Sequence, residues 1–199
     1  MKKVVLIDTH ALIHRAYHAL PPLTMPGGEP VNAVYGFTSI LLRIIRELKP
    51  DYIAAASDMA APTFRHTAYD GYKATRPKAP DDLISQFAKV NEVMQAFHIP
   101  VFEKEGYEAD DVIGTLAKKL EEEKDVETIV VTGDMDALQL IHPALRVYTM
   151  KKGITETAIY DEAAVKERYG LTPRQIIDFK ALKGDPSDNI KGVRGIGEK

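Results

Sequence analysis

Short apolar runs rich in Val and Ile alternate with segments of helical periodicity along most of this 199-residue chain. The runs that predict strands are residues 4–7, 52–56, 101–102, 128–132 and 146–149. The segments that predict helices are residues 11–19, 33–48, 81–97, 108–123, 135–141, 161–169 and 173–182, with Asp81 and Asp161 as expected N-caps. This alternation predicts an α/β fold with a mainly parallel sheet.

The composition excludes several classes of protein. There is no cysteine, so disulfides, thiolate catalysis and cysteine-bound zinc are ruled out. No apolar run approaches the roughly 20 residues of a membrane span, and residues 4–7 are too short for a signal peptide. We therefore expect a cytoplasmic protein. The net charge of −3 includes nine acidic residues that we assign below to metal binding, so it is compatible with a nucleic-acid partner.

Two stretches depart from the alternation. Residues 62–80 have little apolar periodicity and predict either an exposed basic and aromatic excursion or an ordinary solvated loop; they hold Arg65, His66, Tyr69, Tyr72, Lys73, Arg76 and Lys78. Residues 184–199 hold glycine at four positions, 184, 192, 195 and 197. The chain stops at Gly197-Glu198-Lys199, where a helix is expected to begin, so we expect a fragment of a longer protein.

Acidic residues follow four of the predicted strands. They are Asp8 after the first, Asp58 after the second, Glu108, Asp110 and Asp111 after the third, and Asp134 and Asp136 after the strand at 128–132. In an open parallel sheet the carboxyl ends of the strands form the ligand-binding edge. Each acid alone is as easily explained as a helix cap or a solvated side chain. Four successive strand ends with acids favour a shared site.

Gathered carboxylates repel one another, by about 4 kcal/mol for one pair at about 4 Å and an effective dielectric near 20. Helix N-termini offset only roughly 0.3–1 kcal/mol each. A divalent cation would neutralise the cluster, and an all-oxygen ligand set suits Mg²⁺ or Mn²⁺. So many carboxylates can hold two ions, which is an arrangement suited to phosphodiester hydrolysis.

Three motifs resemble those of the 5′→3′ exonuclease domain of bacterial DNA polymerase I, within the flap endonuclease family. They are the runs E-A-D-D-V-I-G-T-L from Glu108, T-G-D-M-D from Thr132 and K-G-D-P-S-D-N-I from Lys183. The runs D-M-A-A-P-T-F-R-H from Asp58 and Y-K-A-T-R from Tyr72 also match. The resemblance implies a PIN-like (resolvase-like) three-layer catalytic domain over residues 1–170, with an arch-like basic segment at 62–80. Residues 171–199 would begin a truncated helix-hairpin-helix.

The resemblance also implies roles for individual residues. Asp8, Asp58, Glu108 and Asp110 resemble the ligands of a first Mg²⁺ or Mn²⁺ ion. Asp134, Asp136 and Asp185 resemble those of a second, and Asp111 and Asp188 match further acids. Lys73 and Arg76 would contact the scissile phosphate, and Tyr72 would stack on a base. The remaining expected DNA contacts are Arg15, Arg65, Lys78, Lys191, Gly192, Arg194, Gly195 and Gly197. A monovalent cation at the hairpin is a further expectation.

The chain departs from the family pattern at two places. Thr9 and His10 stand where small residues usually follow the first Asp, and Lys191 and Arg194 stand where prolines are common. His10 and His14 have a zinc-like spacing, but no third ligand accompanies them, so we interpret them as surface histidines.

The resemblance implies structure-specific hydrolysis of DNA at 5′ flaps and 5′ ends. We expect a monomer, associated with the nucleoid, that forms the N-terminal part of a DNA polymerase I and acts in RNA primer removal and repair. Two alternatives stay open: a PIN-type ribonuclease with the same metal chemistry, and a module that binds DNA without cleaving it. The glycine-rich end and the arch-like segment argue for DNA, and the acid set argues for cleavage.

Overall fold

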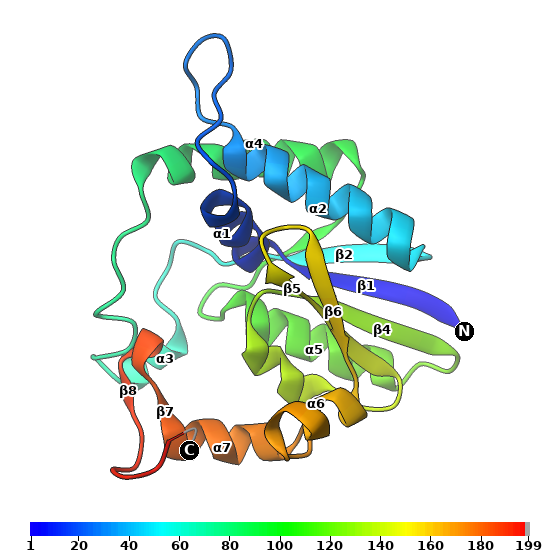
Figure 1. Cartoon of the computed structure of the whole chain (residues 1–199), viewed down its shortest axis with the longest axis vertical. Helices are drawn as coiled ribbons and strands as arrows, with labels where there is room; N and C mark the ends of the chain where they lie inside the picture. The colour runs from blue at the N-terminus through cyan, green and yellow to red at the C-terminus, as the bar shows by residue number, and fades with distance from the viewer. Residues whose placement is uncertain (198–199) are drawn as a thin grey trace.

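Six strands form one sheet between two layers of helices in the computed structural model, which describes residues 1–197 (Figure 1). All neighbouring strands are parallel except the last pair, β5 and β6. The expected three-layer α/β fold with a mainly parallel sheet is confirmed. In spatial order the strands are β3 (Val101–Phe102), β2 (Tyr52–Ala56), β1 (Lys2–Asp8), β4 (Val126–Val131), β5 (Leu145–Lys152) and β6 (Glu156–Tyr160).

The two faces of the sheet bury separate apolar clusters. One face is covered by α1 (Thr9–Ala19), α2 (Asn32–Leu48) and α4 (Asp81–Ala96). On α2 the side chains of Phe37, Leu41 and Ile44 are buried at helical spacing. The other face is covered by α5 (Ala109–Glu121), the 3₁₀ helix η1 (Met135–Leu140), α6 (Glu162–Tyr169) and α7 (Gln175–Lys183).

The strand register aligns the carboxyl ends of the central strands. Asp8 of β1 lies opposite Ala56 of β2, and Ile7 lies opposite Val131 of β4. Ala56 in turn lies opposite Phe102 of β3. The chain segments that follow these four strands therefore leave the sheet at one edge.

Some local expectations are corrected. The antiparallel strand β6 was not expected. Asp81 is the first residue of α4 rather than its N-cap, which is Pro80. The cap at Asp161 is confirmed, since its carboxylate accepts the Ala164 N–H at 2.8 Å. None of the helices within residues 1–197 is both long and apolar enough to cross a membrane.

Both unusual stretches contain ordered structure. The basic segment includes a short helix, α3 (Phe64–Ala68), followed by turns. After α7 the chain forms a hairpin, β7 (Gly184–Asp185), the 3₁₀ turn η2 (Pro186–Asp188) and β8 (Ile190–Lys191). The helix expected to begin at Gly197 would lie at Glu198 and Lys199, outside the described residues.

Candidate active site

A cavity of about 1760 Å³ lies at the carboxyl edge of the sheet, bordered by the basic segment and the C-terminal hairpin. It brings together side chains from the whole length of the chain. All nine acids expected to bind metal line it: Asp8, Asp58, Glu108, Asp110, Asp111, Asp134, Asp136, Asp185 and Asp188.

Asp8 and Asp134 are joined through one hydroxyl. The Thr132 Oγ1–H donates to Asp8 Oδ2 at 2.7 Å, and the same oxygen accepts the Asp134 backbone N–H at 2.9 Å. The Ala11 N–H donates to the other Asp8 oxygen at 3.0 Å, so Asp8 caps α1. Burial raises the pKa of Asp8, and the negative charges of Asp58 and Asp134 act in the same direction. Thr132 belongs to the T-G-D-M-D motif, but this bridging role was not expected from the sequence.

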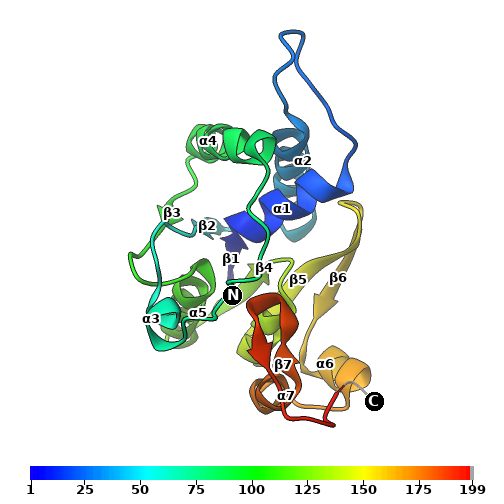
Figure 2. The same ribbon diagram turned by 90° about the vertical axis from the view of Figure 1, so that its left-hand side faces the viewer.

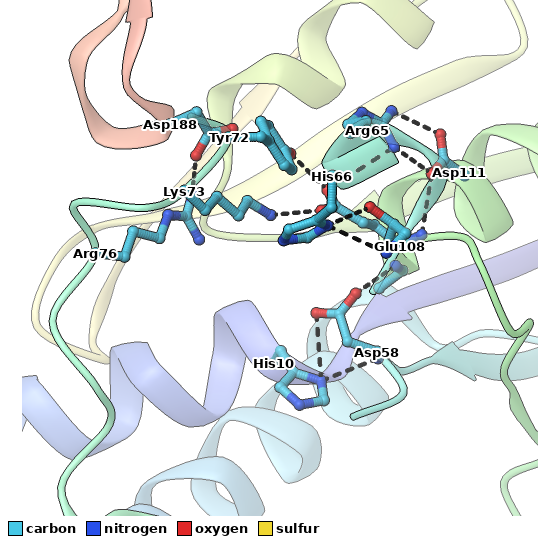
Figure 3. Close-up of polar contacts among 12 residues, drawn as sticks. His10, Asp58, Arg65, His66, Tyr72, Lys73, Arg76, Glu108, Asp111 and Asp188 are labelled. Atoms are coloured by element: carbon cyan, nitrogen blue, oxygen red, sulfur yellow. Dashed lines mark hydrogen bonds and ion pairs between the residues drawn. The ribbon is translucent and has the colours of Figure 1, made fainter. Parts of the chain in front are cut away.

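Asp58 is held between β2, α1 and α5. One carboxylate oxygen accepts the Ala109 N–H at the start of α5, at 2.7 Å. His10 Nδ1 accepts the Asp58 backbone N–H at 3.2 Å and lies 3.7 Å from its other carboxylate oxygen (Figure 3). His10 thus lines the cavity and contacts Asp58, which its interpretation as a surface histidine did not include. Its place two residues after Asp8 was the only sequence signal.

Asp110 carries the clearest electrostatic signature of the cavity. It projects from the first turn of α5. Although its side chain meets the solvent of the cavity, the surrounding protein raises its pKa to about 8, first by desolvation and then through the charges of Asp8, Asp134, Asp58 and Glu108. Desolvation and the neighbouring like charges thus both favour the protonated form of this carboxyl group.

The basic segment neutralises the acids at the start of α5. Lys73 Nζ donates to Glu108 Oε1 at 2.8 Å, and the Tyr72 hydroxyl donates to Glu108 Oε2 at 3.0 Å (Figure 3). Arg65 binds Asp111 through two parallel hydrogen bonds of 2.6 and 2.8 Å. Burial works against the charged form of Asp111, but these bonds prevail and its pKa is lowered.

The acids of the hairpin and η1 are also paired. Lys180 of α7 lies 2.8 Å from Asp136 Oδ1 and 2.8 Å from Asp185 Oδ2. Burial opposes ionisation of Asp185, but the bonds from Lys180 and Ser187 outweigh it and hold its pKa well below the usual range. Arg76 forms an ion pair with Asp188. Lys180 was not among the residues expected from the sequence.

These pairings bear on whether the site fits divalent ions. Among residues 1–197, no group of three or more His, Asp or Glu side chains is close enough to hold a metal ion as arranged. The shared coordination sphere expected from the sequence is therefore not preformed. The donor set nevertheless fits Mg²⁺ or Mn²⁺, because all its ligands are carboxylate oxygens. Desolvation raises the pKa of Asp110, and the charges of the neighbouring acids raise it further. Lys73 pairs with Glu108, and Lys180 pairs with Asp136 and Asp185. A metal ion would compete with these two lysines for the carboxylates.

Two residues that were expected to contact DNA make contacts within the protein instead. Tyr72 is only 6% exposed and its ring packs edge-on against His66 at 5.1 Å, so it offers no free face for a base. Arg15 donates from Nε to the Gly153 carbonyl at 3.0 Å and from Nη2 to the Met150 carbonyl at 2.7 Å. These bonds tie α1 to the β5–β6 hairpin, so the expected phosphate contact of Arg15 is not available in this arrangement.

The other expected DNA contacts lie at the rim or beyond it. Arg65 is occupied by Asp111, and Lys78 is exposed outside the cavity. The exposed end of the hairpin and the segment after it carry Lys191, Gly192, Arg194, Gly195 and Gly197. Packing within the protein requires glycine at position 192, because a Cβ there would lie 2.1 Å from the Lys183 carbonyl oxygen.

Comparison with known sequences finds one family over most of the chain. The model described as 5′-3′ exonuclease, N-terminal resolvase-like domain matches residues 3–170. DNA polymerase I of Bacillus caldotenax is 49% identical over 198 residues, which cover 100% of this chain and 22% of the polymerase. That of Chloroflexus aurantiacus is 48% identical over 201 residues, covering 98% of this chain and 21% of the polymerase. The chain thus spans about a fifth of the length of these relatives.

Solved structures share the fold at low sequence identity. A bacteriophage T5 5′-exonuclease with divalent metal ions (zinc) bound is 22% identical with a TM-score of 0.76, covering 100% of this chain and 72% of that one. A bacteriophage T5 flap endonuclease in complex with DNA and metal ions is 21% identical with a TM-score of 0.77 and the same coverage. Together with the acids at the carboxyl edge of the sheet, the match over residues 3–170 establishes that this chain belongs to the family of 5′-3′ exonuclease N-terminal resolvase-like domains.

Proposed function

We propose that this chain hydrolyses phosphodiester bonds of DNA near a 5′ end, as a 5′→3′ exonuclease and flap endonuclease that uses two Mg²⁺ or Mn²⁺ ions. The observation that carries the proposal is the convergence of nine acids on one cavity, with the pKa of Asp110 raised to about 8 by burial and by its neighbours. Carboxylates gathered at this density in a cavity are stabilised by bound cations.

Each acid has a proposed role. Asp8, Asp58, Glu108 and Asp110 hold the first ion, and Asp134, Asp136 and Asp185 hold the second. When bound, the pair of ions supplies an activated water and stabilises the leaving oxygen. Asp111 and Asp188 act through their basic partners, since Asp111 orients Arg65 and Asp188 orients Arg76.

Lys73 is the proposed electrophilic residue. Its ammonium already reaches into the cavity, 2.8 Å from Glu108 Oε1. Released from Glu108, it can donate to a non-bridging oxygen of the scissile phosphate, where negative charge develops. Arg76 lines the same wall of the cavity and adds a second positive charge.

The exposed end of the chain is the proposed grip on duplex DNA. Lys191 and Arg194 supply positive charge, and Gly192, Gly195 and Gly197 allow the backbone to approach a phosphate. A monovalent cation at this hairpin and phosphate contacts by Arg65 and Lys78 complete the proposal. The proposed domains are a catalytic domain at residues 1–170 and a DNA-binding region from residue 171 onward.

The relatives suggest the setting. They are DNA polymerase I of bacteria, so we place the activity in the cytoplasm, on nucleoid DNA. There a monomeric domain would remove RNA primers during replication and cut 5′ flaps during repair.

A cleavage assay tests the function. The chain should shorten a 5′-flap DNA in Mg²⁺ or Mn²⁺ and not in chelator. Asp134→Asn should lose most of the turnover while keeping DNA binding. Glu92→Gln, which also replaces a carboxylate by an amide but at an exposed position of α4, should keep both. Equal cleavage of unstructured RNA would favour a PIN-type ribonuclease. Binding without turnover in the unmodified chain would favour a non-cleaving module.

A separate measurement tests the role of Lys73. Lys73→Ala should lower kcat much more than it weakens DNA binding, because the ammonium acts on charge that develops only in the transition state. Equal losses in kcat and in affinity would reject that role and leave Lys73 as a plain phosphate contact.

A further inference from the structure

The segment after α3 lies beside the C-terminal hairpin (Figure 2). Arg76 bonds to the Ser187 carbonyl oxygen and pairs with Asp188, and a second group of bonds lies nearer to α3. The Tyr69 hydroxyl donates to the Asn189 carbonyl oxygen at 3.1 Å. In return, Asn189 Nδ2 donates to the Gly71 carbonyl oxygen at 2.9 Å. The Lys73 backbone N–H donates to the Asp188 carbonyl oxygen at 3.0 Å. These bonds join two parts of the chain that lie more than 110 residues apart, and none of them needs a charged side chain.

Both sides of this contact have a backbone conformation that most residues avoid. Lys73 has φ 55° and Asn189 has φ 59°, both in the left-handed region. Asparagine is among the few side chains that tolerate this region. At position 189, glycine would adopt the conformation but could not donate to Gly71, and alanine would fit neither requirement.

Gly71 completes the contact. A Cβ at this position would lie 2.5 Å from Cζ and from the hydroxyl oxygen of Tyr69. The Tyr69 ring therefore lies across Gly71, and the hydroxyl reaches Asn189 only because no side chain stands in its way. Tyrosine, glycine and asparagine each have a separate reason to be where they are.

We propose that Tyr69 and Asn189 form a clasp that holds Lys73 over the acidic cavity, which makes Asn189 a positioning residue for Lys73. Lys73 follows Gly71 by two residues, and its own N–H bonds to Asp188, the residue before Asn189. The clasp thus sets the direction in which the Lys73 side chain enters the cavity. One consequence rests on the proposed function. If the hairpin grips DNA and Lys73 acts on the scissile phosphate, the same hairpin both binds DNA and positions Lys73.

Proteolysis of the 199-residue chain in chelator tests the clasp without any nuclease activity. Asn189→Gly keeps the left-handed backbone and removes the amide donor, and Tyr69→Phe removes only the hydroxyl. Loss of one neutral hydrogen bond should raise the open population about fivefold. Trypsin cleavage after Lys73 should therefore rise about fivefold relative to cleavage after Lys152, the last residue of β5; Arg76 precedes proline and resists trypsin.

Tyr107→Phe is the matched control, because Tyr107 is also exposed and aromatic but contacts Phe64 rather than the hairpin. Its cleavage ratio should equal that of the unmodified chain. A ratio that fails to rise in Tyr69→Phe or in Asn189→Gly, or that rises equally in Tyr107→Phe, would overturn the clasp.

Kinetics on a 5′-flap DNA in Mg²⁺ tests the positioning of Lys73. Asn189→Gly and Tyr69→Phe should each lower kcat in proportion to the closed population that the variant loses, with little change in KM. The double variant loses both hydrogen bonds, so it should raise the open population about 25-fold and lower kcat by more than either single variant. A kcat that stays unchanged in the double variant, or a change in KM alone, would reject the positioning role. If the unmodified chain has no turnover, the proposed function fails while the proteolysis result still decides the clasp.

Discussion

The hydroxyl of Thr132 joins two carboxylates that come from different strands. It is fully buried, donates to Asp8 and accepts the N–H of Asp134. A valine has nearly the same shape but can do neither, so Thr132→Val leaves a buried carboxylate and a backbone donor without this partner. The expected loss in the free energy of unfolding is about 1–3 kcal/mol.

Thermal unfolding of Thr132→Val in chelator measures this loss. For a chain of this size, each kcal/mol lowers Tm by about 2–4 °C. Thr128→Val is the control, since Thr128 is also buried in β4 but lies four residues before the carboxyl edge. Equal losses in the two variants would show that the bridge between Asp8 and Asp134 contributes nothing special.

Asp110 makes stability depend on pH in an unusual direction. Its pKa is raised to about 8, so between about pH 4 and pH 8 the folded chain keeps a proton that the unfolded chain releases. The stability associated with this group is complete at low pH and falls as pH rises toward 8. Without metal, Asp110→Asn should therefore stabilise the chain relative to the parent, more at pH 8.5 than at pH 5. A pH-independent difference in chemical denaturation would contradict this.

At the level of the elements, the sequence predicted the helices and strands whose apolar side chains recur in the pattern that burial requires. Residues 33–48 were expected to form a helix because their apolar side chains recur at helical spacing, and α2 occupies Asn32–Leu48. The strand β6 escaped prediction because it is short, antiparallel and lies at an edge with Ile159 exposed, so its pattern resembles a loop.

The candidate site was predictable to the same extent. Seven of the nine acids were found because strand ends meet at one edge of the sheet, and Asp185 and Asp188 were found through the family resemblance. Their partners were not, because Lys180 reaches Asp136 across 44 residues of sequence and its spacing carries no periodic signal. Base stacking by Tyr72 was expected from the family resemblance, whereas the fold turns this ring inward onto Glu108.

Helix α7 brings a positive charge to two acids on other elements. Lys180 lies 2.8 Å from both Asp136 and Asp185, in the place where a cation would be bound by these carboxylates. Lys180→Met removes the competing charge, so binding of Mn²⁺ should become severalfold tighter even as the metal-free chain loses stability. Titration followed by the electron paramagnetic resonance of free Mn²⁺ measures the affinity.

Lys166→Met on α6 controls for the change in net charge, since Lys166 is exposed and outside the cavity. It should leave the Mn²⁺ affinity nearly unchanged. Weaker Mn²⁺ binding in Lys180→Met would mean that the lysine organises the ligands rather than competing with the ion.

Acids from position 8 to position 188 of the chain line one cavity. Repulsion between them lowers the stability of the folded chain, and bound divalent ions should remove this repulsion. Binding to the folded chain alone at about 100 times Kd adds about 2.7 kcal/mol, which for this size raises Tm by roughly 5–10 °C. Mg²⁺ or Mn²⁺ should produce this rise and NaCl at equal ionic strength should not, because screening is weak inside a cavity. Asp134→Asn should reduce the rise and Glu92→Gln should keep it. A rise that NaCl reproduces would mean that the acids are merely screened, and the case for a metal-dependent site would fail.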